Sequence, residues 1–110
     1  MSSINVDQLV TSMLQAAQGV LADKWPEARD YAESEFKKIG QAIAFIEAQR
    51  ALSLMSDEKA QLHLEMQKNA AKTMLLTLEG LGILAVEAVI NAALDAVKSA
   101  VNTALGFALI

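Results

Sequence analysis

The stretch GILAVEAVINAALDAVKSAVNTALGFALI, residues 82–110, decides the fold of this chain. Alanine is the strongest helix former and residues 83–105 hold no glycine or proline, so the stretch predicts a long helix over residues 82–109. At about 100° per residue its charged and amide side chains fall on one narrow band. They are Glu87, Asn91, Asp95, Lys98 and Asn102. Nearly all of the remaining circumference is apolar, which is more apolar surface than a helix at the edge of a monomeric bundle can bury.

Alanines recur at every fourth position of this predicted helix and form a row of methyl groups. They are Ala88, Ala92, Ala96, Ala100, Ala104 and Ala108. Small side chains let another helix approach closely, so we expect the row to be an oligomer interface. The row predicts a homodimer or higher homo-oligomer, although an apolar helix face would bind a different protein by the same physics.

Sequence signals for two more helices lie at the N-terminal end. Asn5 with Gln8 three residues later forms a capping-box pattern, which predicts a helix over residues 4–22. Pro26 is tolerated in a first helical turn, and it opens a predicted helix over residues 25–55. Apolar residues then repeat at 4-3-4-3 spacing, which is typical of an antiparallel bundle seam. They are Ala32, Phe36, Ile39, Ile43 and Ile46.

Ser56, followed by two acidic residues, favours a new helix start and predicts a third helix over residues 57–79. The alternative is one unbroken helix over residues 26–79, which would be about 80 Å long at about 1.5 Å per residue. Gly80 and Gly82 then favour a turn. The third helix has a second apolar side that predicts contact with two neighbours. Its residues are Leu62, Met66 and Leu76.

Composition agrees with this pattern. Of the 110 residues, 20 are Ala, 54% are hydrophobic and one is Pro, so helix should dominate. The length suits a single domain over residues 1–110. We therefore expect an all-α fold, an up-down four-helix bundle with helices near 4–22, 25–55, 57–79 and 82–109, packed in a dimer or higher oligomer.

Charge and cysteine content exclude several function classes. The net charge is −4 and the basic residues are scattered, so no nucleic-acid partner is expected. The chain has no cysteine, which removes disulfides and thiol chemistry. The N-terminus lacks a secretory pattern, and the longest uncharged stretch near the C-terminus, residues 99–110, is too short to span a bilayer. A cytoplasmic location is the expectation.

One group of polar side chains is a candidate site. If the second and third helices pair around Ser56, four polar residues on their facing sides would gather in one layer. They are Glu47, Arg50, His63 and Gln67. A hydrogen-bonded layer that fixes helix register is the favoured interpretation, because a buried charge needs a partner. The alternative is a binding site with Arg50 as an anion clamp or His63 as a proton acceptor.

Metal and nucleophilic chemistry find little support. A carboxylate-bridged metal site in a bundle needs Glu-x-x-His motifs, whereas His63 is the only histidine and Ala60 stands three residues before it. No metal or cofactor is expected, the sequence does not identify a small-molecule ligand, and no nucleophile or phosphate-loop motif is present. Four acids near the start of the second helix are predicted to form a solvated face. They are Glu27, Asp30, Glu33 and Glu35.

These patterns predict a non-catalytic structural or protein-interaction protein that self-associates through its apolar C-terminal helix. The first alternative is a lipid- or membrane-associating helical protein, which the acidic polar band with its single Lys98 does not favour. The second alternative is a metal-binding helical bundle, in which oligomerisation would gather ligands from several chains.

Overall fold

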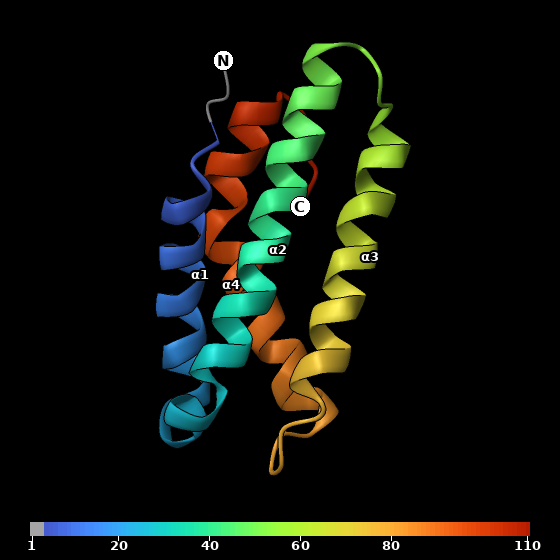
Figure 1. The fold of residues 1–110 in the computed structure, drawn as a ribbon. Coiled ribbons are helices and arrows are strands. Elements are labelled where there is room, and N and C mark those ends of the chain that lie inside the picture. The colour runs from blue at the N-terminus through green and yellow to red at the C-terminus, as the bar shows by residue number, and fades with distance from the viewer. Residues whose placement is uncertain (1–3) are drawn as a thin grey trace.

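The computed structural model describes residues 4–110, and its helices follow one another up and down (Figure 1). The elements are α1 (Val6–Leu21), the 3-10 turn η1 (Ala22–Lys24), α2 (Trp25–Ala51), α3 (Asp57–Leu75) and α4 (Ile83–Leu105). Strands are absent from this described range. The predicted all-α four-helix bundle is therefore confirmed.

Two side-chain caps explain where α1 and α3 begin. The Asn5 side chain accepts a hydrogen bond from the Gln8 amide at 3.1 Å. The Ser56 hydroxyl accepts one from the Lys59 amide at 3.2 Å. The amides of a first helical turn have no partner within the helix, so each cap stabilises a helix start. The alternative of a single helix over residues 26–79 is wrong.

Three helices end about four residues earlier than the apolar pattern predicts. α2 ends at Ala51, α3 at Leu75 and α4 at Leu105. Gly106, with a φ of +76°, takes the left-handed conformation that ends α4. Past these ends, Met55, Leu78 and Leu109 still pack on the bundle, whereas Leu52, Leu54 and Leu76 are exposed. Apolar spacing therefore extends the predicted helices beyond their hydrogen-bonded ends.

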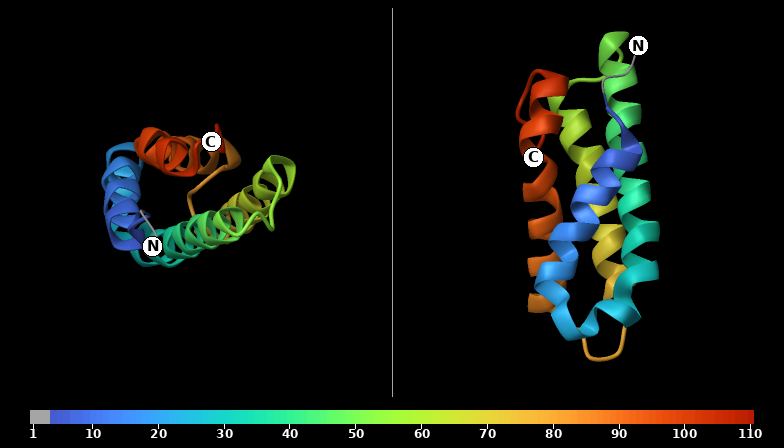
Figure 2. Two further views of the ribbon diagram at one scale, coloured as in Figure 1. Left: turned by 90° about the horizontal axis from the view of Figure 1, so that it is seen from above. Right: turned by 90° about the vertical axis from the view of Figure 1, so that its left-hand side faces the viewer.

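The four helices form an open row rather than a closed square. Seen along the bundle axis, α4, α1, α2 and α3 follow one another around a U (Figure 2). The extensive contacts join α1 to α4, α1 to α2, and α2 to α3, whereas α3 meets α4 over a much smaller contact. Each end helix of the row, α3 or α4, therefore has one closely packed neighbour.

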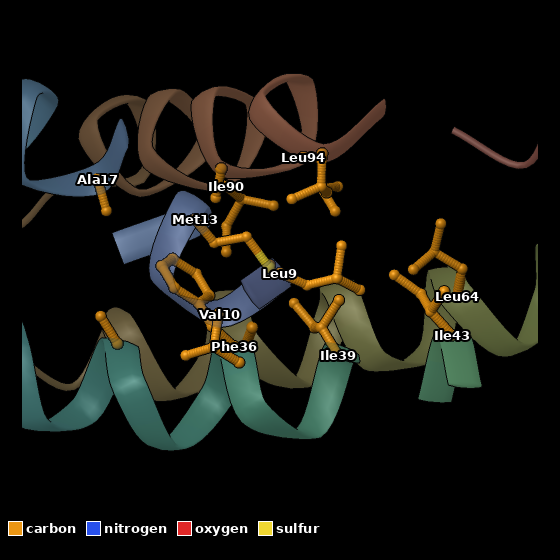
Figure 3. Close-up of a cluster of buried hydrophobic side chains, with 14 of the residues drawn as sticks. Leu9, Val10, Met13, Ala17, Phe36, Ile39, Ile43, Leu64, Ile90 and Leu94 are labelled. Atoms are coloured by element: carbon orange, nitrogen blue, oxygen red, sulfur yellow. The ribbon is translucent and has the colours of Figure 1, made fainter. Parts of the chain in front are cut away.

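The core fills the inside of this U, with side chains from all four helices (Figure 3). The predicted seam of α2 is confirmed, since Ala32, Phe36, Ile39, Ile43 and Ile46 are fully buried. Gly40 lies beside this seam at the α1 contact, where an added Cβ would be 3.1 Å from Val6 Cγ1. The missing side chain lets α1 and α2 approach closely.

Candidate functional site

Arg50 joins three segments of the chain. It stands in the last turn of α2, where its Nη1 forms an ion pair with the Asp57 carboxylate at the start of α3. The same nitrogen donates to the Met55 carbonyl at 3.4 Å. On another side, the guanidinium carbon lies 4.0 Å from the centre of the Phe107 ring, a cation–π contact. These contacts tie the end of α2 to the α2–α3 loop and to the C-terminal segment.

The other members of the predicted polar group make contacts in different directions. The His63 ring packs against the Phe45 ring, with centroids 5.8 Å apart and planes tilted by 44°. Glu47 accepts a hydrogen bond from the Ile4 amide at 3.3 Å. Gln67 is half-buried on α3. These contacts lead outside the predicted group and hold together neighbouring elements, while a ligand-binding role for the four residues remains a prediction.

The acidic residues of α2 are not all on a solvated face. Glu27 and Asp30 are exposed and Glu33 is half-buried, but Glu35 is buried, which corrects the prediction for this residue. Glu35 lies on the side of α2 that faces α3, and its carboxylate pairs with Lys38 at 3.2 Å. The long lysine side chain supplies the opposite charge from the surface. Within residues 4–110, no three His, Asp or Glu side chains are grouped closely enough to hold a metal ion.

The alanine row lies mostly on the outside of α4. Ala88, Ala96 and Ala100 are exposed, and Ala92 and Ala104 are half-buried. The core side of the helix is made by other residues, namely Val86, Val89, Ile90, Ala93, Leu94, Val97 and Val101. The helix ends before Ala108, so this residue does not continue the helical row, and its place in an oligomer interface stays a prediction.

Most of the row and two hydroxyl residues beside it form one uncharged strip, which the exposed Asp95 borders on one side. We call it the α4 outer face. It consists of Ala88, Ala92, Ala96, Ser99, Ala100 and Thr103. Leu84, one turn before Ala88, is 79% exposed. A helix that packs on this face would gain dispersion contacts and would remove apolar surface from water.

Asn102, in the polar band of α4, holds the C-terminal tail, residues 106–110. Its Oδ1 accepts hydrogen bonds from the Leu109 amide at 3.0 Å and from the Ile110 amide at 3.1 Å. Its Nδ2 donates to the Ile110 carbonyl at 3.4 Å. Leu109 is buried in the core as a result. The sequence pattern did not predict this role of Asn102 in holding the tail, because it places Asn102 in the solvent-exposed polar band of the helix.

The second apolar side of α3 is exposed as well. Leu62 is 60% and Met66 61% exposed, and Leu76, just after the last residue of α3, is 41% exposed. The single well-packed neighbour of α3, which is α2, lies elsewhere on its circumference. The sequence predicted two neighbours for this helix, and the second side has no cover within the described chain.

No protein-family model, curated protein or solved structure matches this chain. Across residues 4–110, no helix combines the length and apolar character needed to cross a membrane.

Proposed function

We propose that this protein is a non-catalytic structural or interaction protein that binds a second copy of itself through the α4 outer face. The supporting observation is that this face stays open to solvent after the chain has folded, and that none of its six residues is charged. Most exposed helix faces in soluble domains carry charge, so an uncharged face is typical of a contact surface.

The small size of these residues favours another helix as the bound group. Alanine, serine and threonine let two helix axes approach to about 8 Å, the short end of the usual range of helix packing. A second copy presents the same small face, and a twofold axis would bury both at once. Leu84 would add a large apolar contact at one end of each copy.

A non-catalytic role agrees with how the reactive side chains are used. The Arg50 guanidinium is engaged by Asp57, and the His63 ring is packed against Phe45. Catalytic groups instead converge on a substrate-sized space beside a nucleophile or an acid–base partner. The contacts of Arg50 and His63 connect elements of the fold.

The test is the mass in solution of an Ala96→Glu variant. Ala96 is exposed in the single chain, so the variant should fold normally, while a carboxylate in the middle of a helix contact would be desolvated. Ala48→Glu is the matched control, because Ala48 is an exposed alanine on α2. We expect Ala96→Glu to weaken association at least tenfold by sedimentation equilibrium, and Ala48→Glu to leave it unchanged.

Three results would contradict the proposal. A monomeric wild type at about 100 µM would remove self-association, and equal masses for wild type and Ala96→Glu would remove this face. A monomer that floats with phospholipid vesicles would support the membrane-associating alternative instead.

A further inference from the structure

The exposed side of α3 has the spacing of a helix–helix seam. We call it the α3 outer face. Its residues are Leu62, Met66, Asn69, Thr73 and Leu76, and all five are exposed. They follow one another at intervals of 4, 3, 4 and 3, the spacing of the a and d positions of a coiled coil. Over this range the seam is about 21 Å long at about 1.5 Å per residue.

We propose that the α3 outer face binds the same face of a second copy, with the two α3 helices antiparallel. This contact is separate from the α4 outer face, because α3 and α4 are the two ends of the row of helices (Figure 2). It therefore stands or falls independently of the proposed function.

Charge complementarity along one flank of the seam supports a second copy as the partner. In an antiparallel pair related by a twofold axis, the same flank of each helix meets itself. Glu65 and Lys72 lie on one flank, one heptad apart, and carry opposite charges. When Met66 packs opposite Asn69 of the partner subunit, Glu65 lies beside the partner's Lys72. The twofold axis repeats this pair, so the contact gains two ion pairs.

A parallel arrangement lacks this match. In a parallel coiled coil, a residue on this flank of one helix lies beside a residue on the opposite flank of the partner helix. The partner residue has a number higher by five. Glu65 would then lie beside the partner's Ala70, which offers no charge.

The two charged side chains are free enough to make this contact. The Glu65 side chain is 54% exposed, and its pairing with Lys68 within the chain, at 3.5 Å, is an exposed contact that exchanges readily. Lys72 is half-buried. Its long side chain can keep its stem on α3 while the ammonium group extends outward.

Charge exchange tests the proposal without removing any apolar side chain. The experiment compares Glu65→Lys, Lys72→Glu and the double variant by sedimentation equilibrium, each on an Ala96→Glu background so that the α4 outer face does not contribute. Each single change turns two attractions into two repulsions. At the strength usual for exposed ion pairs, the dimer should weaken about 4- to 30-fold. The double variant restores opposite charges and should return to within about threefold of the background.

Several results would overturn the inference. They are the absence of a dimer on the Ala96→Glu background at about 1 mM, single variants that dimerise as well as the background, and a double variant as weak as the singles. Circular dichroism of each variant checks that the fold is intact. If Ala96→Glu itself changes nothing, the proposed function fails while the charge exchange still reports on α3.

Disulfide trapping tests the orientation separately, and the chain has no cysteine of its own to interfere. Leu62→Cys and Thr73→Cys chains, one carrying a mass tag, are mixed and oxidised. The antiparallel register places Leu62 opposite the partner's Thr73, so crosslinks between the two variants should dominate. Crosslinks of each variant with itself would show a parallel pair and overturn the antiparallel arrangement.

Discussion

Replacing Asn102 by alanine should release the C-terminal tail from the bundle. This one side chain accepts hydrogen bonds from two tail amides, those of Leu109 and Ile110, at 3.0 and 3.1 Å. The tail has left the helix at Gly106, so these amides have no partner within α4. The Leu109 amide also donates to the Phe107 carbonyl at 3.0 Å, so the Ile110 amide depends most on Asn102. The apolar side chain of Leu109 is held in the core by the same contacts.

The expected cost follows from these contacts. A hydrogen bond of this kind contributes about 0.5–1.5 kcal/mol net, so the two together contribute about 1–3 kcal/mol. The helix propensity of alanine exceeds that of asparagine by up to about 0.7 kcal/mol and offsets part of the loss. We therefore expect the free energy of unfolding to fall by about 1.5 kcal/mol, which corresponds to a midpoint lowered by roughly 6–10 °C.

Chemical denaturation at matched protein concentration measures this change, and hydrogen exchange at Leu109 and Ile110 locates it. Asn91→Ala is the control, because Asn91 is an exposed residue of the same helix and the same substitution there should be neutral or stabilising. Asn102→Asp keeps the accepting oxygen but loses the Nδ2 donor to Ile110 and places a negative charge in the last turn of α4, so it should recover only part of the stability. A loss of less than about 0.3 kcal/mol for Asn102→Ala, or unchanged protection of both tail amides, would contradict this role of Asn102.

Two further substitution pairs test the fold. Gly80 has a φ of +88°, so Gly80→Ala should lower the free energy of unfolding by about 1–2 kcal/mol. Gly19 lies inside α1, where an added Cβ meets no atom within 4 Å, so Gly19→Ala should raise it by about 0.5–1 kcal/mol. Thermal unfolding that ranks the two variants the other way would contradict the turn geometry at Gly80. Phe36 is fully buried, so Phe36→Ala should lower the free energy of unfolding, measured with denaturant, by about 3–5 kcal/mol. Phe45 is 49% exposed, so Phe45→Ala should lower it by about 1 kcal/mol. Equal losses for the two variants would contradict the assigned core.

The features that sequence predicts here are the local ones. Asn5 and Ser56 cap helices because a hydroxyl or amide oxygen can reach an amide three residues away in any fold. The α2 seam, with Phe36 and Ile43 at helical spacing, needs only the period of a helix to be recognised as a core face. Neither inference depends on where another helix lies.

The features that sequence missed depend on tertiary contacts. Leu109 looks like the continuation of an apolar helix, yet it reaches the core from a tail that reverses after Gly106. Arg50 was assigned to a layer with His63, whereas its contacts are Asp57 and the Phe107 ring. The same spacing along α2 is compatible with both partners. Only the position of the tail and the α2–α3 loop decides between them.

The open row of helices explains why this chain has more apolar surface than its own core uses. In a closed bundle each helix has two close neighbours, but α3 and α4 have one each, so each keeps an apolar or uncharged side toward solvent. In the sequence, the excess of apolar surface is most evident in the C-terminal helix. In the structure, both α3 and α4, the two ends of the row, carry part of this excess. If the α3 outer face and the α4 outer face each bind a different copy of the chain through a twofold axis, every chain makes two self-complementary contacts. Such a subunit would assemble beyond a dimer, into a closed tetramer where the axes intersect at right angles and into an open chain where they do not intersect.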